Sequence, residues 1–424
     1  MTSRLVSDAQ AVSSQWLNEL DLVSLTEQRL EASGLLDPGA GVGVDVVAIG
    51  KASREMSAAA IAILGTRLRR RLTVCDEASA SLNHRTPDVV VGEHPVPGEG
   101  SLNAGKALVA FLEEPSPADC TLFLLSGGAS SLCVLPETPV TLQDLRGIWD
   151  AAMISGIDIT TLNKIRASSS AVAGGGVLRH VRTARSQSLI LVDNVMSGVE
   201  WVASGMTYDY LPTPEEVTSL IDWIGLSKTP LGHRLLEASA NRASALATPI
   251  TSHHDNTVLA DPAMMLGYAI AEARRRGYRV LDMGSHVHGD VAVVSERWAD
   301  ALRREVASSD SVAVLGVGEV TVRVGGAGMG GRCQEFAWYM AKVLAEFDRD
   351  AAFVARASDG RDFIEGVGGA WVERSTMERA LTSGVDWLAV AQANDTHSAL
   401  RALGQLLEGG HTGWNLCDLY VALM

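Results

Sequence analysis

Short apolar runs alternate along this chain with longer segments in which apolar residues recur every three or four positions. Residues 45–49, 121–125 and 188–192 are nearly continuous apolar runs, which is typical of strands buried on both faces. Residues 53–68 and 142–154 have helical spacing instead. Strands that alternate with amphipathic helices predict an α/β fold with an open, parallel sheet.

The same alternation continues in the second half of the chain. Further strands are expected at 278–281, 311–315, 351–355 and 419–423. At 424 residues the chain is longer than one hydrophobic core usually supports, so two domains are expected. The segment 226–256 lacks clear periodicity and is interpreted as the connection between them. We therefore assign the domains to residues 1–250 and 251–424.

The chain is acidic, with 50 acidic against 35 basic residues and a net charge of −15. Nucleic acids are bound through clustered Lys and Arg, so this composition argues against a nucleic-acid partner. No apolar run resembles a signal peptide or is long enough to span a bilayer. Five scattered cysteines fit reduced thiols better than disulfides or zinc. We expect a cytoplasmic protein that acts on a small molecule, without a membrane partner, and that could form a homodimer.

The most informative stretch is the loop Ser126–Ser131, which follows the strand expected at 121–125. Open α/β sheets bind ligands at the carboxyl ends of their strands, where backbone N–H groups face the crevice. The loop has small side chains, and its glycines allow a ligand to approach closely. An ordinary strand-to-helix turn is the alternative interpretation. The candidate substrate-binding residues are Ser126, Gly127, Gly128, Ala129 and Ser130.

Other polar residues also lie beside predicted strands. Lys51, one of only five lysines, follows the strand at 45–49 and predicts a phosphate or carboxylate contact, unless it is a solvated turn lysine. Asp193 and Asp359 each follow a predicted strand. A carboxylate there can hold Mg2+ through one ligand, although an Asp that caps a turn is equally common. His94 lies in a loop that is stiffened by Pro95 and Pro97, and it could line the site, but a lone loop histidine is more often structural.

A second glycine-rich loop, Gly325–Gly331, precedes Arg332 and contains the spacing Gly-x-Gly-x-x-Gly. The dinucleotide fingerprint would require an acidic residue at the end of the next strand. Asp348 and Asp350 instead precede that strand, so the fingerprint fails on position. What remains is a predicted backbone nest for an anion at a helix N-terminus, with Arg332 beside it.

Two histidine pairs are weak candidates for metal binding. His253 and His254 have no third ligand at a convincing spacing, and we interpret them as part of the connection. His286 and His288 form a His-x-His pattern that some hydrolases use, but the pair alone is weak support. A metal-dependent hydrolase is therefore the last of the functions that we consider.

These motifs, in this order, resemble the type II glycerate 2-kinase family, whose second half is the MOFRL domain. The resemblance covers nearly the whole chain, and its specificity lies in the shared order of short motifs. The matching segments are Gly50–Ser53, His94–Pro97, Ser126–Gly128, Asn163–Arg166, Ala203–Gly205, Gly330–Glu335, Asp359–Gly360 and Thr412–Asn415.

The resemblance implies a Rossmann-like, doubly wound N-terminal domain, a smaller α/β MOFRL-type domain and a cleft between them. It implies transfer of a phosphoryl group from ATP to D-glycerate with Mg2+. Lys51 and Arg332 match the catalytic cations of the family, and Arg166 is assigned to the substrate. The residues assigned to the nucleotide and its metal are Asn163, Gly174, Gly175, Asp193 and Asn415, with Asp193 and Asp359 as metal ligands.

The chain departs from the family at several charged positions. Relatives have Lys-His where this chain has Ala167-Ser168, and a lysine where it has Ala173. They have aspartates where it has Ser197 and Gly366, and an asparagine where it has Cys333. The main hypothesis is a kinase of a glycerate-like acid with an altered substrate. The alternative is a relative that has lost ATP-dependent activity and binds or transforms another phosphorylated or carboxylated small molecule.

Overall fold

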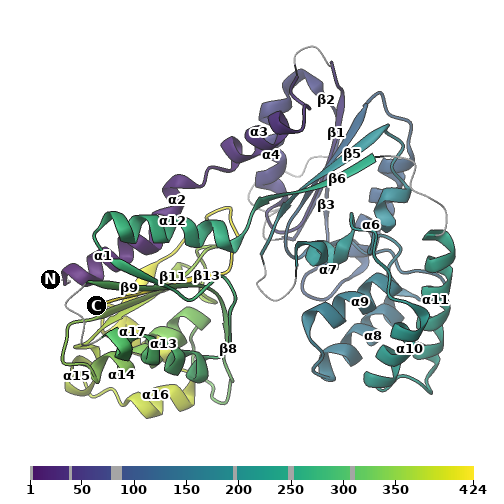
Figure 1. The fold of residues 1–424 in the computed structure, drawn as a ribbon. Helices are drawn as coiled ribbons and strands as arrows, with labels where there is room; N and C mark the ends of the chain where they lie inside the picture. Colours follow the sequence, from purple (N-terminus) through teal and green to yellow (C-terminus); the bar gives the residue numbers. More distant parts are fainter. Residues whose placement is uncertain (1–2, 38–40, 78–87, 194–197, 247–252, 306–310) are drawn as a thin grey trace. The chain divides into compact units, whose positions relative to one another are not determined.

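The computed structural model describes residues 3–37, 41–77, 88–193, 198–246, 253–305 and 311–424. They form two compact units, which we call the parallel-sheet unit and the mixed-sheet unit (Figure 1). The parallel-sheet unit holds Leu22–Val192 and the described residues from 198 to Ala260. The mixed-sheet unit holds the described residues up to Asp21, Asp193, and Asp261–Met424.

The sheet of the parallel-sheet unit has the order β3-β2-β1-β4-β5-β6, and all its pairings are parallel. Its strands are β1 (Val44–Ile49), β2 (Leu68–Cys75), β3 (Val89–Val91), β4 (Cys120–Leu125), β5 (Arg185–Leu191) and β6 (His253–Ala260). This is the strand order of Rossmann folds, in which the direction of winding reverses between β1 and β4. The predicted Rossmann-like fold is confirmed, and the loops after β1 and β4 lie at the point where ligands bind in such sheets.

Helices cover both faces of this sheet and add a helical layer beside it (Figure 1). Helices α3 (Leu22–Ala32) and α4 (Ser53–Leu64) lie on one face, and α6 (Glu99–Glu113) and α7 (Ala129–Leu132) on the other. The added layer packs around buried leucines and isoleucines. It consists of α8 (Leu142–Ile154), α9 (Ile159–Ser169), α10 (Pro214–Trp223) and α11 (Pro230–Leu246).

The sequence suggested that the segment 226–256 is a loose connection, but the structure shows regular elements there. It contains α11, whose Leu235 and Ala238 are fully buried in the helical layer, and the start of β6. Its pattern is weak because β6 is the edge strand of the sheet and its first residues are partly exposed. The predicted domain boundary at residue 250 lies outside the described residues, and the described division lies between Ala260 and Asp261.

The mixed-sheet unit is built on a seven-stranded sheet of order β12-β11-β10-β13-β9-β7, with β8 also paired to β9. β7 and β8 run parallel to β9, and the other pairings are antiparallel. The strands are β7 (Arg279–Asp282), β8 (Val287–Asp290), β9 (Val312–Thr321), β10 (Ala352–Ala357), β11 (Val367–Glu373), β12 (Leu406–Glu408) and β13 (Asp418–Leu423). The two-domain α/β organisation is therefore confirmed.

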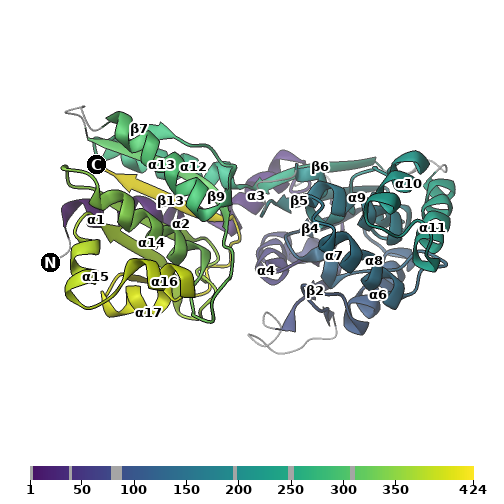
Figure 2. The same ribbon diagram turned by 90° about the horizontal axis from the view of Figure 1, so that it is seen from below.

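Two groups of helices enclose the mixed sheet (Figure 1). One face is covered by α1 (Arg4–Ser14), α2 (Trp16–Glu19) and α12 (Pro262–Arg275). Helices α13 (Val291–Glu305) and α14 (Arg332–Ala345) lie side by side on the other face (Figure 2). The same side carries α15 (Thr376–Thr382), α16 (Trp387–Ala393) and α17 (Thr396–Ala402).

The low aromatic content, 5%, suggests cores made of aliphatic residues. This holds for most of the parallel-sheet unit, but the mixed-sheet unit concentrates aromatic side chains in one cluster. Trp298, Phe336, Phe353 and Tyr420 are fully buried there, with ring centroids 4.8–6.2 Å apart. Composition cannot reveal this, because these residues come from four separate elements.

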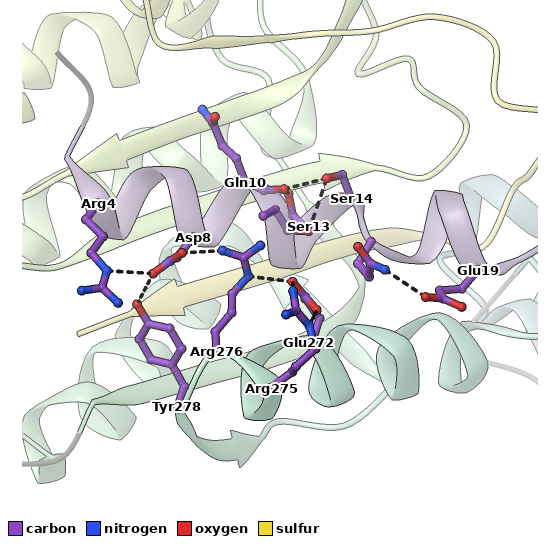
Figure 3. A network of polar contacts seen from close by, with 12 residues as sticks. Arg4, Asp8, Gln10, Ser13, Ser14, Glu19, Glu272, Arg275, Arg276 and Tyr278 are labelled. Atoms are coloured by element: carbon purple, nitrogen blue, oxygen red, sulfur yellow. Dashed lines mark hydrogen bonds and ion pairs between the residues drawn. The ribbon is translucent and has the colours of Figure 1, made fainter.

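Helix α1 belongs to the mixed-sheet unit, although its position in the chain assigned it to the first domain. Val6, Ala9 and Val12 are fully buried, and α1 packs against β10 and β13. Its Asp8 lies within a polar network on this surface (Figure 3). Asp8 Oδ1 is 2.5 Å from Arg276 Nη1, and the hydroxyl of Tyr278 donates a 2.9 Å hydrogen bond to Asp8 Oδ2.

The network continues from Asp8 into α12. Arg276 Nε also donates to Glu272 Oε1 at 2.7 Å, and Glu272 is only 4% exposed. Burial and the bond to Asp8 raise the pKa of Tyr278 to about 12, so its hydroxyl stays protonated as a donor. The network therefore fastens the first helix to residues more than 260 positions further along the chain.

All five cysteines are buried and free. Among the residues that the structure describes, no helix is both long and apolar enough to cross a membrane.

We expect Asp8→Asn to lower the free energy of unfolding by about 1.5–3 kcal/mol, because two hydrogen bonds to a charged, largely buried acceptor are weakened. Arg4→Ala is the matched control. Arg4 is 91% exposed and 3.8 Å from Asp8, so its loss should change stability by about 0.5 kcal/mol or less. Denaturant unfolding followed by circular dichroism measures both. Equal effects of the two substitutions would contradict this account of the network.

Candidate functional site

The loops that follow β1 and β4 are joined by backbone contacts. Ile49 pairs with Leu125, so Gly50 and Ser126 lie side by side at the carboxyl ends of these strands. A Cβ atom on Gly50 would lie 2.2 Å from Ser126 Oγ, and Gly50 has a φ of +131°. Only glycine fits at this position. Lys51 N then donates to Gly127 O at 2.9 Å, which ties the lysine to the second loop.

Gly128 brings a third segment to this point. It precedes α7 with a φ of +82°, and a Cβ atom there would lie 3.2 Å from both His94 Cδ2 and Lys51 Cγ. Lys51, His94 and Gly128 are therefore neighbours, although they come from three different loops. Partial burial and the charges of Lys51 and Arg166 lower the pKa of His94, so its imidazole is neutral at pH 7.

The guanidinium of Arg166, on α9, has few hydrogen-bond acceptors around it. Its guanidinium lies over the ring of Trp149, 4.8 Å from the centroid, and Nη1 donates a long hydrogen bond of 3.3 Å to Asn163 Oδ1. Its Nε is buried without a hydrogen-bond partner among the described residues. Burial lowers the pKa of Arg166 to about 10, so the group remains charged at neutral pH. A half-buried cation with few acceptors of its own fits an anionic ligand.

A cavity of about 170 Å³ opens between these groups within the parallel-sheet unit. Its wall contains three predicted substrate-binding residues, Gly128, Ser130 and Arg166. The other lining residues are His94, Pro95, Val96, Pro97, Ser131, Arg146, Trp149, Asp150 and Met153. We take this cavity, together with the neighbouring Lys51, as the candidate substrate site.

A strained turn supports one side of the site. Ala203 and Ser204 have φ values of 56° and 52°, which non-glycine residues rarely adopt. Ser204 is 1% exposed, and its hydroxyl donates to Asn163 Oδ1 at 3.1 Å and lies 2.7 Å from Ser130 Oγ. Asn163 thus receives hydrogen bonds from both Ser204 and Arg166, and in this structure its carbonyl oxygen positions Arg166.

Several residues of the site were not assigned to it from the sequence. Trp149 has the helical spacing of a core residue, and Arg146, which donates from Nε to Pro97 O at 2.5 Å, looks like a surface residue on a helix. Ser204 could have been found, because it lies in one of the motifs shared with the resembling family. A lone loop histidine such as His94 is more often structural, whereas in this structure His94 lines the cavity.

The glycines assigned to the cofactor, Gly174 and Gly175, are explained by close backbone packing. Their N–H groups donate to Ser204 O at 3.0 Å and to Gly205 O at 2.8 Å. A Cβ atom on Gly174 would lie 2.4 Å from Tyr210 O. Their role in binding a cofactor stays a prediction.

Arg332, in the mixed-sheet unit, is paired with two carboxylates. Its Nη2 lies 3.0 Å from Glu319 Oε1, and its Nε lies 3.4 Å from Asp418 Oδ2. Burial opposes its charge, but these two carboxylates raise the pKa of Arg332 above its usual range. The side chain keeps 46% of its exposure, so it can still meet a ligand. Its joint action with Lys51 stays a prediction, because the two residues belong to different units.

The glycine-rich loop before Arg332 is not an open anion nest. Asn394 Oδ1 accepts hydrogen bonds from the N–H groups of Gly325 and Gly326, at 2.9 and 3.1 Å. The N–H of Gly328 donates to Ala393 O at 2.8 Å. These N–H groups are therefore hydrogen-bonded to the turn that precedes α17.

The first turn of α14 is also occupied by the protein itself. Asp362 accepts the N–H of Cys333 at 3.1 Å and that of Gln334 at 2.9 Å. Asp362 is 4% exposed and fills the place that a phosphate would take at a helix N-terminus. Several donors of the predicted nest are therefore not open to an anion in this structure, because groups distant in sequence accept their hydrogen bonds.

The carboxylates predicted for a metal lie in the mixed-sheet unit. Asp193 Oδ2 accepts a hydrogen bond from Asn415 Nδ2 at 3.3 Å, and Asp359 Oδ1 accepts one from Arg361 N at 2.8 Å. Within the described chain, no three His, Cys, Asp or Glu side chains converge on one point. Mg2+ in kinases needs only one or two carboxylates, because phosphate oxygens and water complete its shell. Asp193 and Asp359 fit the ion in donor type, and their metal role stays a prediction. Ser197, a departure from the family, lies outside the described residues.

Two family models match the chain. One, described as a domain of unknown function, DUF4147, matches residues 8–235, and the other, the MOFRL family, matches residues 312–418. The chain belongs to the DUF4147 family. The MOFRL match begins with β9 and ends at the start of β13. The resemblance to the type II glycerate 2-kinase family with a C-terminal MOFRL domain is confirmed.

Similar proteins cover nearly the whole chain. A D-glycerate 2-kinase of Thermotoga maritima is 28% identical over 389 residues, which are 90% of each chain. A glycerate 2-kinase of Pyrococcus horikoshii is 27% identical and covers 99% of this chain and 96% of its own. A protein of Agrobacterium vitis, provisionally named a hydroxypyruvate reductase, is 29% identical over 89% of this chain and 86% of its own.

A crystal structure of glycerate kinase from Thermotoga maritima has the same fold. Its TM-score is 0.87 at 24% identity, and the match covers 99% of both chains. The DUF4147 member described here therefore has the fold of a solved glycerate kinase.

The stability of the fold should depend on pH through the protonation of Glu335, which lies in the first turn of α14 and is 2% exposed. Burial raises the pKa of Glu335 to about 7, although Asn394 Nδ2 donates to it. Between pH ~4.3, the usual value for Glu, and pH 7 the folded protein holds a proton that the unfolded chain releases. Stability should therefore fall as the pH rises through this window, by up to a few kcal/mol.

Glu335→Gln should remove the part of this loss that Glu335 contributes, so the variant should gain stability relative to the native chain at pH 8 but not at pH 4. Burial also raises the pKa of Asp418 to about 8, and the part of the loss that comes from Asp418 should remain in the variant. Glu378→Gln is the control, because Glu378 is an exposed residue of α15 in the same unit. Denaturant unfolding at both pH values gives the comparison. A native-like pH profile in the Glu335 variant would disprove the assignment.

Proposed function

We propose that this protein is a kinase that phosphorylates a hydroxyl group of a small hydroxy acid, either glycerate or a close relative of it. The names of its relatives support a kinase of the glycerate type. The observation that carries the proposal for this chain is the half-buried Arg166, whose buried Nε lacks an acceptor among the described residues and which lines a small cavity. A planar guanidinium binds a carboxylate through two parallel hydrogen bonds.

The size of the cavity favours the acceptor acid as its occupant. The volume of about 170 Å³ lies below the range of about 300–1,000 Å³ that is usual for drug-sized ligands. This suits an acid of a few carbon atoms and is too small for a nucleotide. The hydroxyls of Ser130 and Ser131, which also line the cavity, can hydrogen-bond the hydroxyl groups of such an acid.

The residues of the site have different roles in the proposed reaction. Arg166 holds the carboxylate, and the ring of Trp149 beneath it keeps the guanidinium in one plane. Lys51, held next to Gly128, offsets negative charge on the transferred phosphoryl group, and Arg332 supplies a second cation. Phosphoryl transfer depends mainly on positioning and charge neutralisation, which this set can provide. ATP would supply the phosphoryl group, with Mg2+ held by Asp193 and Asp359.

A buried arginine that the sequence did not reveal lies beside the position of one missing lysine, but it does not replace that lysine. Ala173 stands where relatives have a lysine, and its carbonyl accepts a hydrogen bond from Arg242 of α11. Arg242 is 3% exposed, and burial lowers its pKa to about 10. It places a positive charge beside the glycine cluster but cannot reach a ligand. We therefore expect weaker use of ATP than in relatives that keep these lysines.

A reductase, as the relative from Agrobacterium vitis is named, is the second candidate. A nicotinamide dinucleotide would need a glycine-rich loop with open N–H groups. The loop of this chain with the matching spacing donates from Gly325, Gly326 and Gly328 to its own neighbours. The kinase is therefore favoured.

Substituting the two cations should separate binding from chemistry. Arg166→Ala should weaken D-glycerate binding by roughly 10- to 100-fold, because a charge-assisted contact worth about 1.5–3 kcal/mol is lost. Lys51→Ala should lower turnover by about 10³ with a smaller change in acid binding, by analogy with other cations that act on phosphoryl groups. Calorimetry measures the first effect and a coupled ADP assay the second.

Arg182→Ala and Lys106→Ala are the matched controls, because both residues are exposed and lie in the same unit. If the Arg166 and Lys51 variants behave like these controls, the assignment of the site is wrong.

Because charged groups of the family are missing, we expect ATP-dependent phosphorylation of D-glycerate to be slower than about 10 s⁻¹, the median for enzymes. A coupled assay of the full chain with Mg-ATP and D-glycerate tests this. Faster turnover would show that the substitutions at Ala167, Ala173 and Gly366 do not impair the reaction.

A further inference from the structure

A second and larger cavity, of about 460 Å³, lies at the amino ends of strands in the parallel sheet. Its floor is formed by the first residues of β4, β5 and β6, where Cys120 pairs with Arg185 and Arg185 with His253. Helix α3 contributes Arg29 to its wall, and Ser33 follows that helix. The candidate substrate site lies at the carboxyl ends of these strands, so the two cavities are separate.

The charged groups of this cavity leave an excess of positive charge. Arg29 Nε is buried and has no hydrogen-bond partner among the described residues. Arg185 lies beside the thiol of Cys120, but burial raises the pKa of that thiol to about 11, so it offers no negative charge. Asp255, the one carboxylate among the residues that line the cavity, lies 3.3 Å from His253 Nδ1.

The neutral polar groups around the cavity are largely engaged with the protein. Ser186 Oγ lies 2.7 Å from His254 Nδ1, and Ser33 Oγ donates to Leu30 O at 2.9 Å. The side chain of Asn256 is bonded to Thr207 through both its oxygen and its nitrogen, at 2.8 Å each. The two guanidinium groups are therefore the strongest donors left for a ligand.

Arg29 also has a structural reason to be where it is. It lies in the last turn of α3, where a cation offsets the partial negative charge of the helix end. That interaction explains the position of its charge, but it does not explain a buried Nε without an acceptor, which is unfavourable. Nor does it explain the second arginine, which belongs to another element.

We propose that this cavity binds a phosphate-bearing small molecule at a site separate from the substrate. A phosphate group presents several oxygens to guanidinium forks, and it carries enough charge to pair with both Arg29 and Arg185. The volume lies within the usual range of small-molecule sites, about 300–1,000 Å³. The remaining space, lined by Ala32, Gln187 and Thr257, would hold the rest of the ligand. This inference does not depend on the proposed kinase activity.

Calorimetric titration of the full chain with inorganic pyrophosphate, at physiological salt and without magnesium, tests the proposal. Arg29→Gln and Arg185→Gln should each weaken pyrophosphate binding tenfold or more. Arg182→Gln, at an exposed arginine of the same unit, and Lys51→Ala, beside the candidate substrate cavity, should leave this binding within about twofold. Arg29→Lys should retain part of the affinity, because it keeps the charge and loses the fork.

A measurement on the native chain makes the test independent of variant folding. Pyrophosphate should slow hydrogen exchange at the end of α3 and at the start of β5 and β6. Absence of binding, unchanged binding in both Arg29 and Arg185 variants, or protection confined to residues around Lys51 would overturn the proposal. Equal binding of citrate would overturn the choice of phosphate as the ligand class.

Discussion

The close contact between the ends of β1 and β4 is the constraint on which the candidate site depends. The residue after β1 must be glycine, because a Cβ atom there would lie 2.2 Å from Ser126 Oγ. This contact holds Lys51 against the Ser126 loop, and Gly128 within that loop makes room for His94. The contact forms at the point where the winding of the sheet reverses, which leaves the crevice above it open to a ligand.

Two glycine-rich loops that look alike in sequence have different chemistry in the fold. The loop after β4 adjoins a cavity that also contains an under-partnered Arg166. The loop before α14 turns its donors towards Asn394, and the helix start behind it is capped by Asp362. A glycine-rich sequence thus permits an anion site, but the neighbours of its N–H groups decide whether they remain open.

Most of the positively charged side chains in the interior of this protein are arginines. Arg242 is buried and Arg166 is half-buried, and desolvation lowers the pKa of each only to about 10, so both remain charged at neutral pH. A buried lysine can lose its proton under the same conditions, which arginine resists. In a chain with five lysines, buried positive charges that act near ligands are therefore mostly permanent.

The sequence by itself determined the fold class, most of the strands and the loops at the carboxyl ends of β1 and β4. These features depend on apolar periodicity and on glycine, which act over a few residues. It did not reveal α1 in the mixed-sheet unit, the start of β6, or Trp149 and Ser204 around Arg166, because each depends on residues far apart in the chain. The closed glycine loop was missed for the same reason, since Asn394 and Asp362 lie many residues beyond the donors they bind. Local pattern specifies where the backbone can approach a ligand, and only tertiary packing decides which polar groups are left unsatisfied to bind it.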